Sequence, residues 1–142
     1  MDHELISLIV EELRENRDGW EVELRGVEFF GQPVSLVLQT MPIPRPEILP
    51  PSEEMKSLVF LVLGSIEGVL TLARSHFEEY HAEGLSVATG SVAHPHIWIY
   101  QDNLEEDGPG RWTFVVESNM NPDYGTHIEF DGLTVVDVWG GD

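Results

Sequence analysis

Two histidines, His94 and His96, are the residues whose type and spacing best fit a chemical role. Residues two apart on a strand project from the same face, so the two imidazoles can share one metal ion. A metal site needs a third ligand, and four residues are candidates for it: His127, Glu129, His76 and His81. Because no spacing selects among these four, we expect solvated histidines, with no bound metal and no cofactor.

Several kinds of catalytic site are excluded by the sequence. The 142 residues contain no cysteine, so there is no thiol nucleophile, thiolate metal site or disulfide framework. Neither a nucleophile elbow nor a phosphate-cradling glycine-rich loop occurs, and no spacing selects a catalytic pair among the 26 acidic residues. We predict no catalytic residue and favour a protein that is not an enzyme. The alternative is a metal-binding protein or metal-dependent hydrolase that uses His94 and His96.

A short acidic segment is the second candidate site. Four carboxylates fall within six positions: Asp102, Glu105, Glu106 and Asp107. We place most of them in a loop from Asn103 to Gly110, and residues 75–110 contain no Lys or Arg. The strands expected on either side carry aromatic residues of the kind that anchor protein interfaces: Trp98, Tyr100 and Trp112. We predict that these acidic and aromatic residues form a docking site for a basic protein.

The net charge of −19 supports that choice of partner. Acidic residues are divided equally, 13 in residues 1–74 and 13 in residues 75–142, whereas basic residues number six and one. Such a balance disfavours nucleic acid and anionic membranes and speeds encounters with basic partners. A role in solubility alone is the other interpretation.

The sequence also favours a cytoplasmic protein. Absence of cysteine fits a reducing compartment, and the N-terminal Met-Asp-His-Glu lacks the basic region of a secretory signal. The longest apolar stretch is interrupted before it reaches the roughly 20 residues that a membrane span needs.

A long helix from Ser52 to Glu83 is expected to position these groups. Apolar residues recur at three- and four-residue steps, which is the period of a buried helix face: Met55, Val59, Val62, Ile66, Val69, Ala73 and Tyr80. Ser52 fits an N-cap and Gly84 a stop. Gly64 and Gly68 stand four apart, a spacing that we interpret as a place where a sheet approaches the helix backbone closely.

Strands are expected where apolar and polar residues alternate. A first hairpin begins at Trp20, with a β-bulge at Gly26 and a turn at Gly31-Gln32. A proline-rich link, Met41–Ser52, leads to the long helix. Four sequential strands follow the helix: His96–Tyr100, Arg111–Glu117, Thr126–Phe130 and Leu133–Trp139. Asp131-Gly132 is expected to be the turn between the last two.

The C-terminal part of the chain carries a resemblance. The segment from Trp112 to Asp142 contains Pro122-Asp123-Tyr124-Gly125-Thr126-His127, then Phe130-Asp131-Gly132 and a final aliphatic strand. This pattern resembles bacterial α+β domains of unknown function, some of which are similar to the immunity proteins that neutralise toxins. The resemblance rests on turns and strands and implies no catalytic residue.

Together these patterns predict one α+β domain over residues 1–142. Its antiparallel sheet of about six strands is covered on one face by the long central helix, and an amphipathic helix at Asp2–Asn16 precedes it. We expect a small acidic binding module, of an inhibitor or immunity type, that docks a basic partner. A structural or oligomeric domain without activity is a further alternative, and the sequence does not set the oligomeric state.

Overall fold

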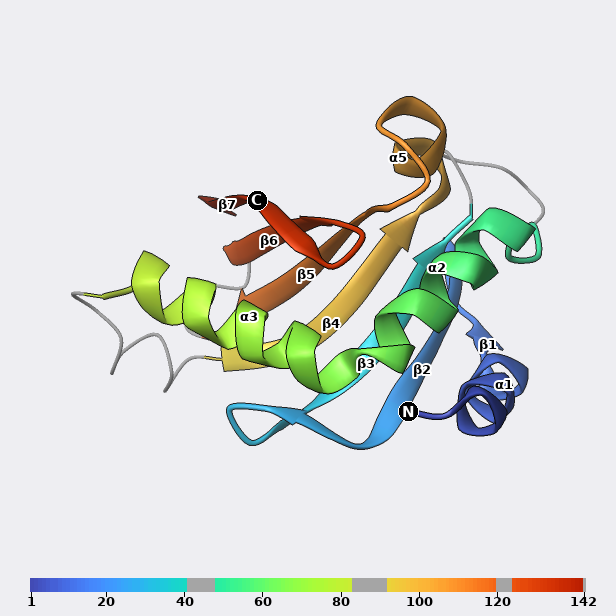
Figure 1. Cartoon of the computed structure of the whole chain (residues 1–142), viewed down its shortest axis with the longest axis horizontal. Coiled ribbons are helices and arrows are strands. Elements are labelled where there is room, and N and C mark those ends of the chain that lie inside the picture. Colours follow the sequence, from blue (N-terminus) through green and yellow to red (C-terminus); the bar gives the residue numbers. More distant parts are fainter. Residues whose placement is uncertain (41–47, 83–91, 120–123, 142) are drawn as a thin grey trace.

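The computed structural model describes residues 1–40, 48–82, 92–119 and 124–141. Its centre is a seven-stranded sheet in which the strands follow one another in sequence order (Figure 1). The strands are β1 (Arg14–Glu15), β2 (Gly19–Phe29), β3 (Gln32–Gln39), β4 (Val92–Tyr100), β5 (Arg111–Ser118), β6 (Gly125–Asp131) and β7 (Thr134–Gly141). The helices are α1 (His3–Glu12), α2 (Glu53–Gly64), α3 (Ile66–Tyr80) and α5 (Gln101–Glu106). The predicted α+β class is confirmed.

The sheet is antiparallel except between β3 and β4, which run parallel. After β3 the chain passes through α2 and α3, which carry it back across the sheet, and β4 then runs beside β3 in the same direction (Figure 1). A helical crossover of this kind is what joins parallel neighbours. The prediction of a wholly antiparallel sheet is therefore wrong at this one pair.

The predicted long helix is two helices, α2 and α3, that meet at Ser65 with a bend of 80°. The Ser65 N–H donates to the carbonyl of Val62 (3.1 Å), and the Ser65 carbonyl accepts from Val69 (3.0 Å), so the first helix ends where the second begins. Gly-Ser pairs are a common cause of sharp kinks, and Gly64-Ser65 is one. The bend lets both helices follow the twisted sheet, and it keeps Val62 and Ile66 buried on either side.

The predicted helical stripe is confirmed through this bend for six of its seven residues. Met55, Val59, Val62, Ile66, Val69 and Ala73 are all at most 5% exposed, whereas Tyr80 is 44% exposed. Ser52 is the N-cap of α2, as predicted, because its hydroxyl accepts the N–H of Met55 (3.2 Å).

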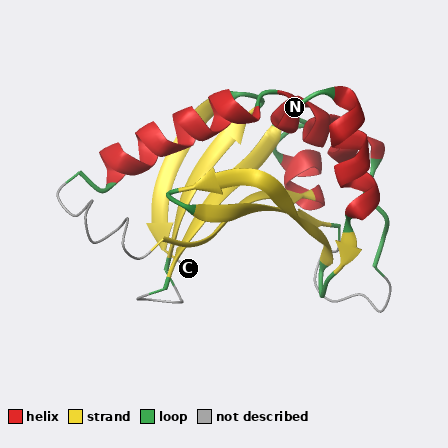
Figure 2. Ribbon diagram, turned by 90° about the horizontal axis from the view of Figure 1, so that it is seen from below, coloured by secondary structure: helices red, strands yellow, loops and turns green. Residues whose placement is uncertain are grey.

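Helices α2 and α3 lie over one face of the sheet (Figure 2). That face carries a continuous cross-strand row of apolar side chains: Val22, Leu36, Ile97, Phe114 and Ile128. The last four are fully buried, and each such side chain stabilises the fold by about 1.5–3 kcal/mol. Trp112 belongs to this face too, because its ring stacks on Phe130 at 4.2 Å and its Nε1–H donates to the carbonyl of Gly132 (2.8 Å).

The first hairpin has the predicted bulge but a different turn. The register shifts between Glu23 and Glu28, around Gly26 with its φ of 73°, which confirms the bulge. The turn residues are Phe30-Gly31, with φ values of 48° and 77°, rather than Gly31-Gln32. Phe30 accepts this uncommon backbone conformation where its ring packs against Phe77 at 5.5 Å.

Other boundaries also differ from the predictions. The final turn is Gly132-Leu133, because Asp131 pairs with Thr134. The first helix ends at Glu12, and β1 follows it. The expected acidic loop begins as helix α5. Residues 41–47 of the proline-rich link, Glu83 and Gly84, and Pro122-Asp123 lie outside the described residues.

Within the described part of the chain, no single helix is long and apolar enough to cross a membrane. Helices α2 and α3 together meet the length and composition criteria, but only as the pair bent by 80°.

Candidate functional site on the open sheet face

The sheet face opposite α2 and α3 is not covered by those two helices (Figure 2), and register places mostly polar and aromatic side chains on it. Strand register aligns them in two cross-strand rows, which together define the open face. The first row is Glu23, Ser35, His96, Val115, His127 and Trp139. The second row is Glu21, Val37, Trp98, Thr113, Glu129 and Asp137. Both candidate sites predicted from the sequence border this face.

A histidine–carboxylate cluster adjoins the middle of the first row at His96, near the start of β4 and the end of β5. The register of β4 shifts between Ala93 and His96, and His94 at this irregularity has a φ of 41°. The bulge brings the His94 and His96 rings into a stack with centroids 4.4 Å apart. Glu117 of β5 completes the cluster, with its Oε2 2.5 Å from Nδ1 of His94 and 3.9 Å from Nδ1 of His96.

These three side chains form a group with the composition of a metal site. One ligand atom from each of His94, His96 and Glu117 lies within 4.8 Å of the others. The Nδ1–H of His96 donates to the carbonyl of His94 (2.8 Å), which leaves Nε2 of that ring as its unprotonated nitrogen. The third group is thus Glu117, which was not among the four residues considered from the sequence.

None of those four residues completes the group. His81, the C-cap residue of α3, pairs its Nε2 with the Thr126 hydroxyl at 2.8 Å, and His76 lies within that helix. Glu129 accepts the Nε1–H of Trp139 (3.0 Å). His127 stacks on Trp139 with centroids 3.9 Å apart.

His127 is nevertheless the next neighbour of the cluster. Its Nε2 lies 3.3 Å from the position that a Cβ on Gly125 would occupy, and Gly125 is the cross-strand partner of Glu117. Its Nδ1 is buried and makes no hydrogen bond of normal geometry among the described residues, although the Gly141 backbone lies near enough to raise the pKa of the ring. An unpaired buried nitrogen of this kind is uncommon.

Burial sets the protonation of these imidazoles. Desolvation lowers the pKa of His96 and outweighs the opposing hydrogen bond to the His94 carbonyl. The charge of His94 lowers this pKa further, Glu117 raises it, and His127 lowers it. Desolvation likewise lowers the pKa of His127. Both rings are therefore neutral at neutral pH, which is the form that binds metals.

The aromatic part of the predicted docking site lies at the other end of β4. Trp98 and Tyr100 stack with centroids 5.5 Å apart. The Nε1–H of Trp98 donates to Gln39 (3.1 Å), and the hydroxyl of Tyr100 donates to the carboxylate of Asp102 (2.9 Å). Desolvation raises the pKa of Tyr100, and the hydrogen bond to Asp102 raises it further. Both rings are thus fixed by hydrogen bonds.

Helix α5 brings the predicted carboxylates beside this aromatic pair. Its Leu104 is 3% exposed and anchors the helix, whereas Glu105, Glu106 and Asp107 are exposed. The structure therefore gathers six of the predicted residues, but Trp112 is 2% exposed on the opposite face and cannot contact a partner there.

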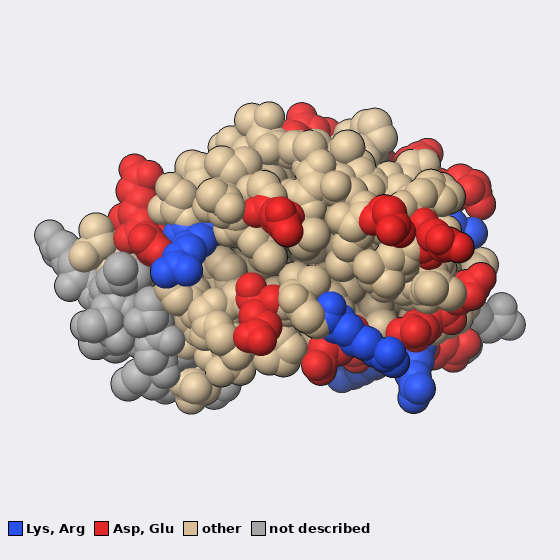
Figure 3. All heavy atoms as spheres, turned by 60° about the horizontal axis from the view of Figure 1, so that its bottom comes forward, with Lys and Arg blue, Asp and Glu red and all other residues tan. Residues whose placement is uncertain are grey.

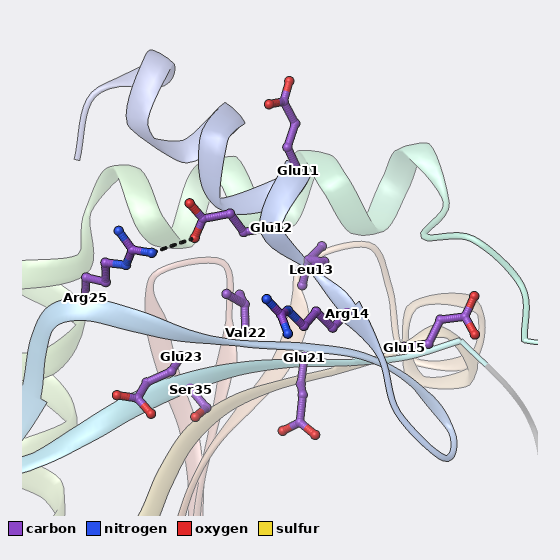
Figure 4. A pocket seen from close by; sticks show the side chains of 10 residues that line it. All are labelled: Glu11, Glu12, Leu13, Arg14, Glu15, Glu21, Val22, Glu23, Arg25 and Ser35. Atoms are coloured by element: carbon purple, nitrogen blue, oxygen red, sulfur yellow. Dashed lines mark ion pairs between the residues drawn. The ribbon is translucent and has the colours of Figure 1, made fainter.

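A third feature is a shallow groove of about 910 Å³ beside α1 and β1, lined by Glu11, Glu12, Leu13, Arg14, Glu15, Glu21, Val22, Glu23, Arg25 and Ser35. Figure 4 shows Glu11 directed away from the strands and Glu21 pointing to the other side of the sheet from Val22. The dashed Arg25–Glu12 pair spans 4.0 Å between side chains that are 90% and 50% exposed, so it contributes little. Because these groups do not converge on one point, the groove provides no chemical site.

Comparisons with family models, with curated proteins and with solved structures find no match to this chain.

Proposed function

We propose that this protein is an acidic binding module that docks a basic segment of a partner protein against Trp98, Tyr100 and helix α5. The observation that carries the proposal is the stacked Trp98–Tyr100 pair, held at both ends by hydrogen bonds to Gln39 and Asp102. Aromatic side chains dominate the energetics of many interfaces, and side chains already fixed in the free protein lose less entropy on binding.

The charge around the pair favours a basic partner. Glu105, Glu106 and Asp107 are exposed beside it, and the second row of the open face adds Glu129 and Asp137. Figure 3 brings the lower edge of Figure 1 forward. On that face acidic side chains are scattered, and basic side chains occur at few places. Charges of one sign steer a partner of the other sign and act chiefly on the association rate. An inhibitor or immunity-type role fits such a surface.

The test begins with affinity capture from the source cell and measures the kinetics of the captured partner by surface plasmon resonance. Glu105→Gln combined with Glu106→Gln is expected to slow association and weaken its dependence on salt. Trp98→Ala is expected to speed dissociation, because it removes the fixed ring.

The matched control changes the same number of carboxylates elsewhere, with Glu11→Gln and Glu12→Gln on α1. It is expected to leave both rate constants close to those of the unmodified protein. The acidic surface serves solubility alone if the association rate constant does not change with salt and the substitutions near α5 alter it no more than the control does.

A further inference from the structure

We propose that His94, His96 and Glu117 bind one divalent transition-metal ion of the zinc class. This role is separate from docking, since the cluster lies at the opposite end of β4 from Tyr100 and α5. Within the described residues, this is the group in which three possible metal-binding side chains come within 4.8 Å of one another.

The donor set selects the class of metal. Two imidazole nitrogens and one carboxylate oxygen are a common ligand set for Zn²⁺ with a fourth position left for water. Mg²⁺ and Ca²⁺ prefer sites made of oxygen atoms alone, so two nitrogens disfavour them. Copper(I) favours soft thiolate and thioether ligands, and the chain has no cysteine.

The distances are close to those that zinc requires. With bonds of about 2.0–2.1 Å in a tetrahedral arrangement, two ligand atoms stand roughly 3.3 Å apart. Oε2 of Glu117 stands 2.5 Å from Nδ1 of His94, and one ligand atom from each of the three side chains lies within 4.8 Å of the others. Because Nδ1 of His96 donates to the His94 carbonyl, the ligand nitrogen of His96 is Nε2. Shifts of about 1–1.5 Å, within the reach of side-chain rotation, bring the atoms into place.

Metal binding requires the His94 ring to rotate, and this exposed side chain has space to do so. Because the imidazoles are stacked, their in-plane lone pairs lie in two nearly parallel planes and do not yet meet at one point. The side chain of His94 is 47% exposed and that of Glu117 is 40% exposed, so both can rotate and the metal can enter from solvent. His96, at 12% exposed, is the fixed member of the site.

The bulge in β4 orients His94 toward Glu117. A regular strand would hold His94 in the ordinary extended conformation, whereas the left-handed φ of 41° places its Nδ1 at the carboxylate of Glu117. Such a backbone is strained for a residue with a side chain. Strained backbone of this kind is concentrated at functional sites.

The experiment titrates the purified full chain with ZnCl₂ by isothermal calorimetry, with MgCl₂ as the comparison. We expect one Zn²⁺ per chain and no detectable Mg²⁺ binding. Glu117→Gln keeps the shape of the side chain and removes its charge, and it should weaken Zn²⁺ binding at least tenfold. His94→Ala and His96→Ala should each do the same, while His76→Ala on α3 should leave the affinity unchanged.

Two further measurements separate ligand loss from misfolding and from binding elsewhere. Circular dichroism without metal should give all four variants the spectrum of the unmodified protein. NMR should show Zn²⁺ shifting the imidazole signals of His94 and His96 but not that of His76. The proposal is wrong if the unmodified chain does not bind Zn²⁺, or if Glu117→Gln and His94→Ala bind it as tightly as the unmodified chain.

Discussion

Replacing Gly68 by alanine is expected to stabilise the protein, although Gly68 lies in a helix beside the core. Gly68 is exposed on α3, and no heavy atom would lie within 4 Å of an added Cβ. The new methyl group therefore meets open space. Glycine within a helix costs roughly 0.5–1 kcal/mol relative to alanine, because it loses more backbone freedom on folding. Gly68 lies in the first turn of α3, where the lower end of that range applies.

The size of the effect follows from the length of the chain. With about 2.1 cal/mol/K of unfolding entropy per residue, a chain of 142 residues has an unfolding entropy near 0.3 kcal/mol/K. A gain of about 0.5 kcal/mol then raises the melting temperature by about 2 °C. Differential scanning calorimetry resolves this shift, and urea denaturation at 25 °C gives the free energy independently.

The sign of the shift separates two accounts of the helix. If Gly68 lets the sheet approach the helix backbone, as its spacing from Gly64 suggests, a methyl group would clash and lower the melting temperature. Gly132→Ala is the matched control, because its Cβ also meets nothing within 4 Å while its φ is 62°. That variant should be destabilised by about 1–2 kcal/mol. A lower melting temperature for Gly68→Ala would refute the structural account.

Two other predictions concern Gly19 and the buried histidines. A Cβ on Gly19 would stand 2.0 Å from the backbone oxygen of Leu38, so Gly19→Ala should force the β2–β3 pair apart and cost more than about 2 kcal/mol in urea denaturation; an unchanged midpoint would contradict this packing. Burial lowers the pKa of His81 and of His127, so below about pH 6.5 the unfolded chain binds protons there that the folded chain does not. Their contribution to stability is complete above that pH and is lost as the pH falls through the lowered values. Denaturation at pH 7.5 and pH 6.0 should show a smaller loss for His127→Gln than for the unmodified protein, and equal losses would contradict the assignment.

The helical stripe was predictable from the sequence, and the bend inside it was not. Val62 and Ile66 are four residues apart, and periodicity alone places both on one face. A continuous helix and two helices joined at Ser65 satisfy that pattern equally well. The choice between them depends on the twist of a sheet whose strands come from both ends of the chain.

The alternation of residues along a strand predicts which face each tryptophan of the docking candidate occupies. Trp112 shares its strand face with Phe114 and Val116. An apolar face of this kind indicates that the ring of Trp112 belongs to the core. Trp98 lies on the other face of its strand from the core residues Ile97 and Ile99, so alternation places its ring on the open face. The burial of Trp112 could therefore have been predicted from its neighbours.

Glu117 could not have been selected in the same way. It lies 23 residues from His94 along the chain, and their contact depends on the register between β4 and β5. That register includes an irregularity between Ala93 and His96. Pro95 within it is a signal for a bulge, but the signal does not say which residue of β5 then faces His94. A two-residue turn can fix register in a hairpin, but β4 and β5 are joined through α5.

The two proposed sites are not electrostatically independent, because they share β4. His96 and Tyr100, the residue before α5, are four residues apart on the strand, a separation of roughly 13 Å along the backbone. That distance exceeds the Debye length of about 8 Å at physiological ionic strength but is well within the roughly 30 Å at 0.01 M salt, so the two sites interact at low ionic strength. A bound Zn²⁺ would offset the charge of Glu117 and add a positive charge within reach of the docking surface. The metal-bound form therefore attracts a basic partner more weakly than the metal-free form, and their association rates should converge as added salt shortens the range of the charge.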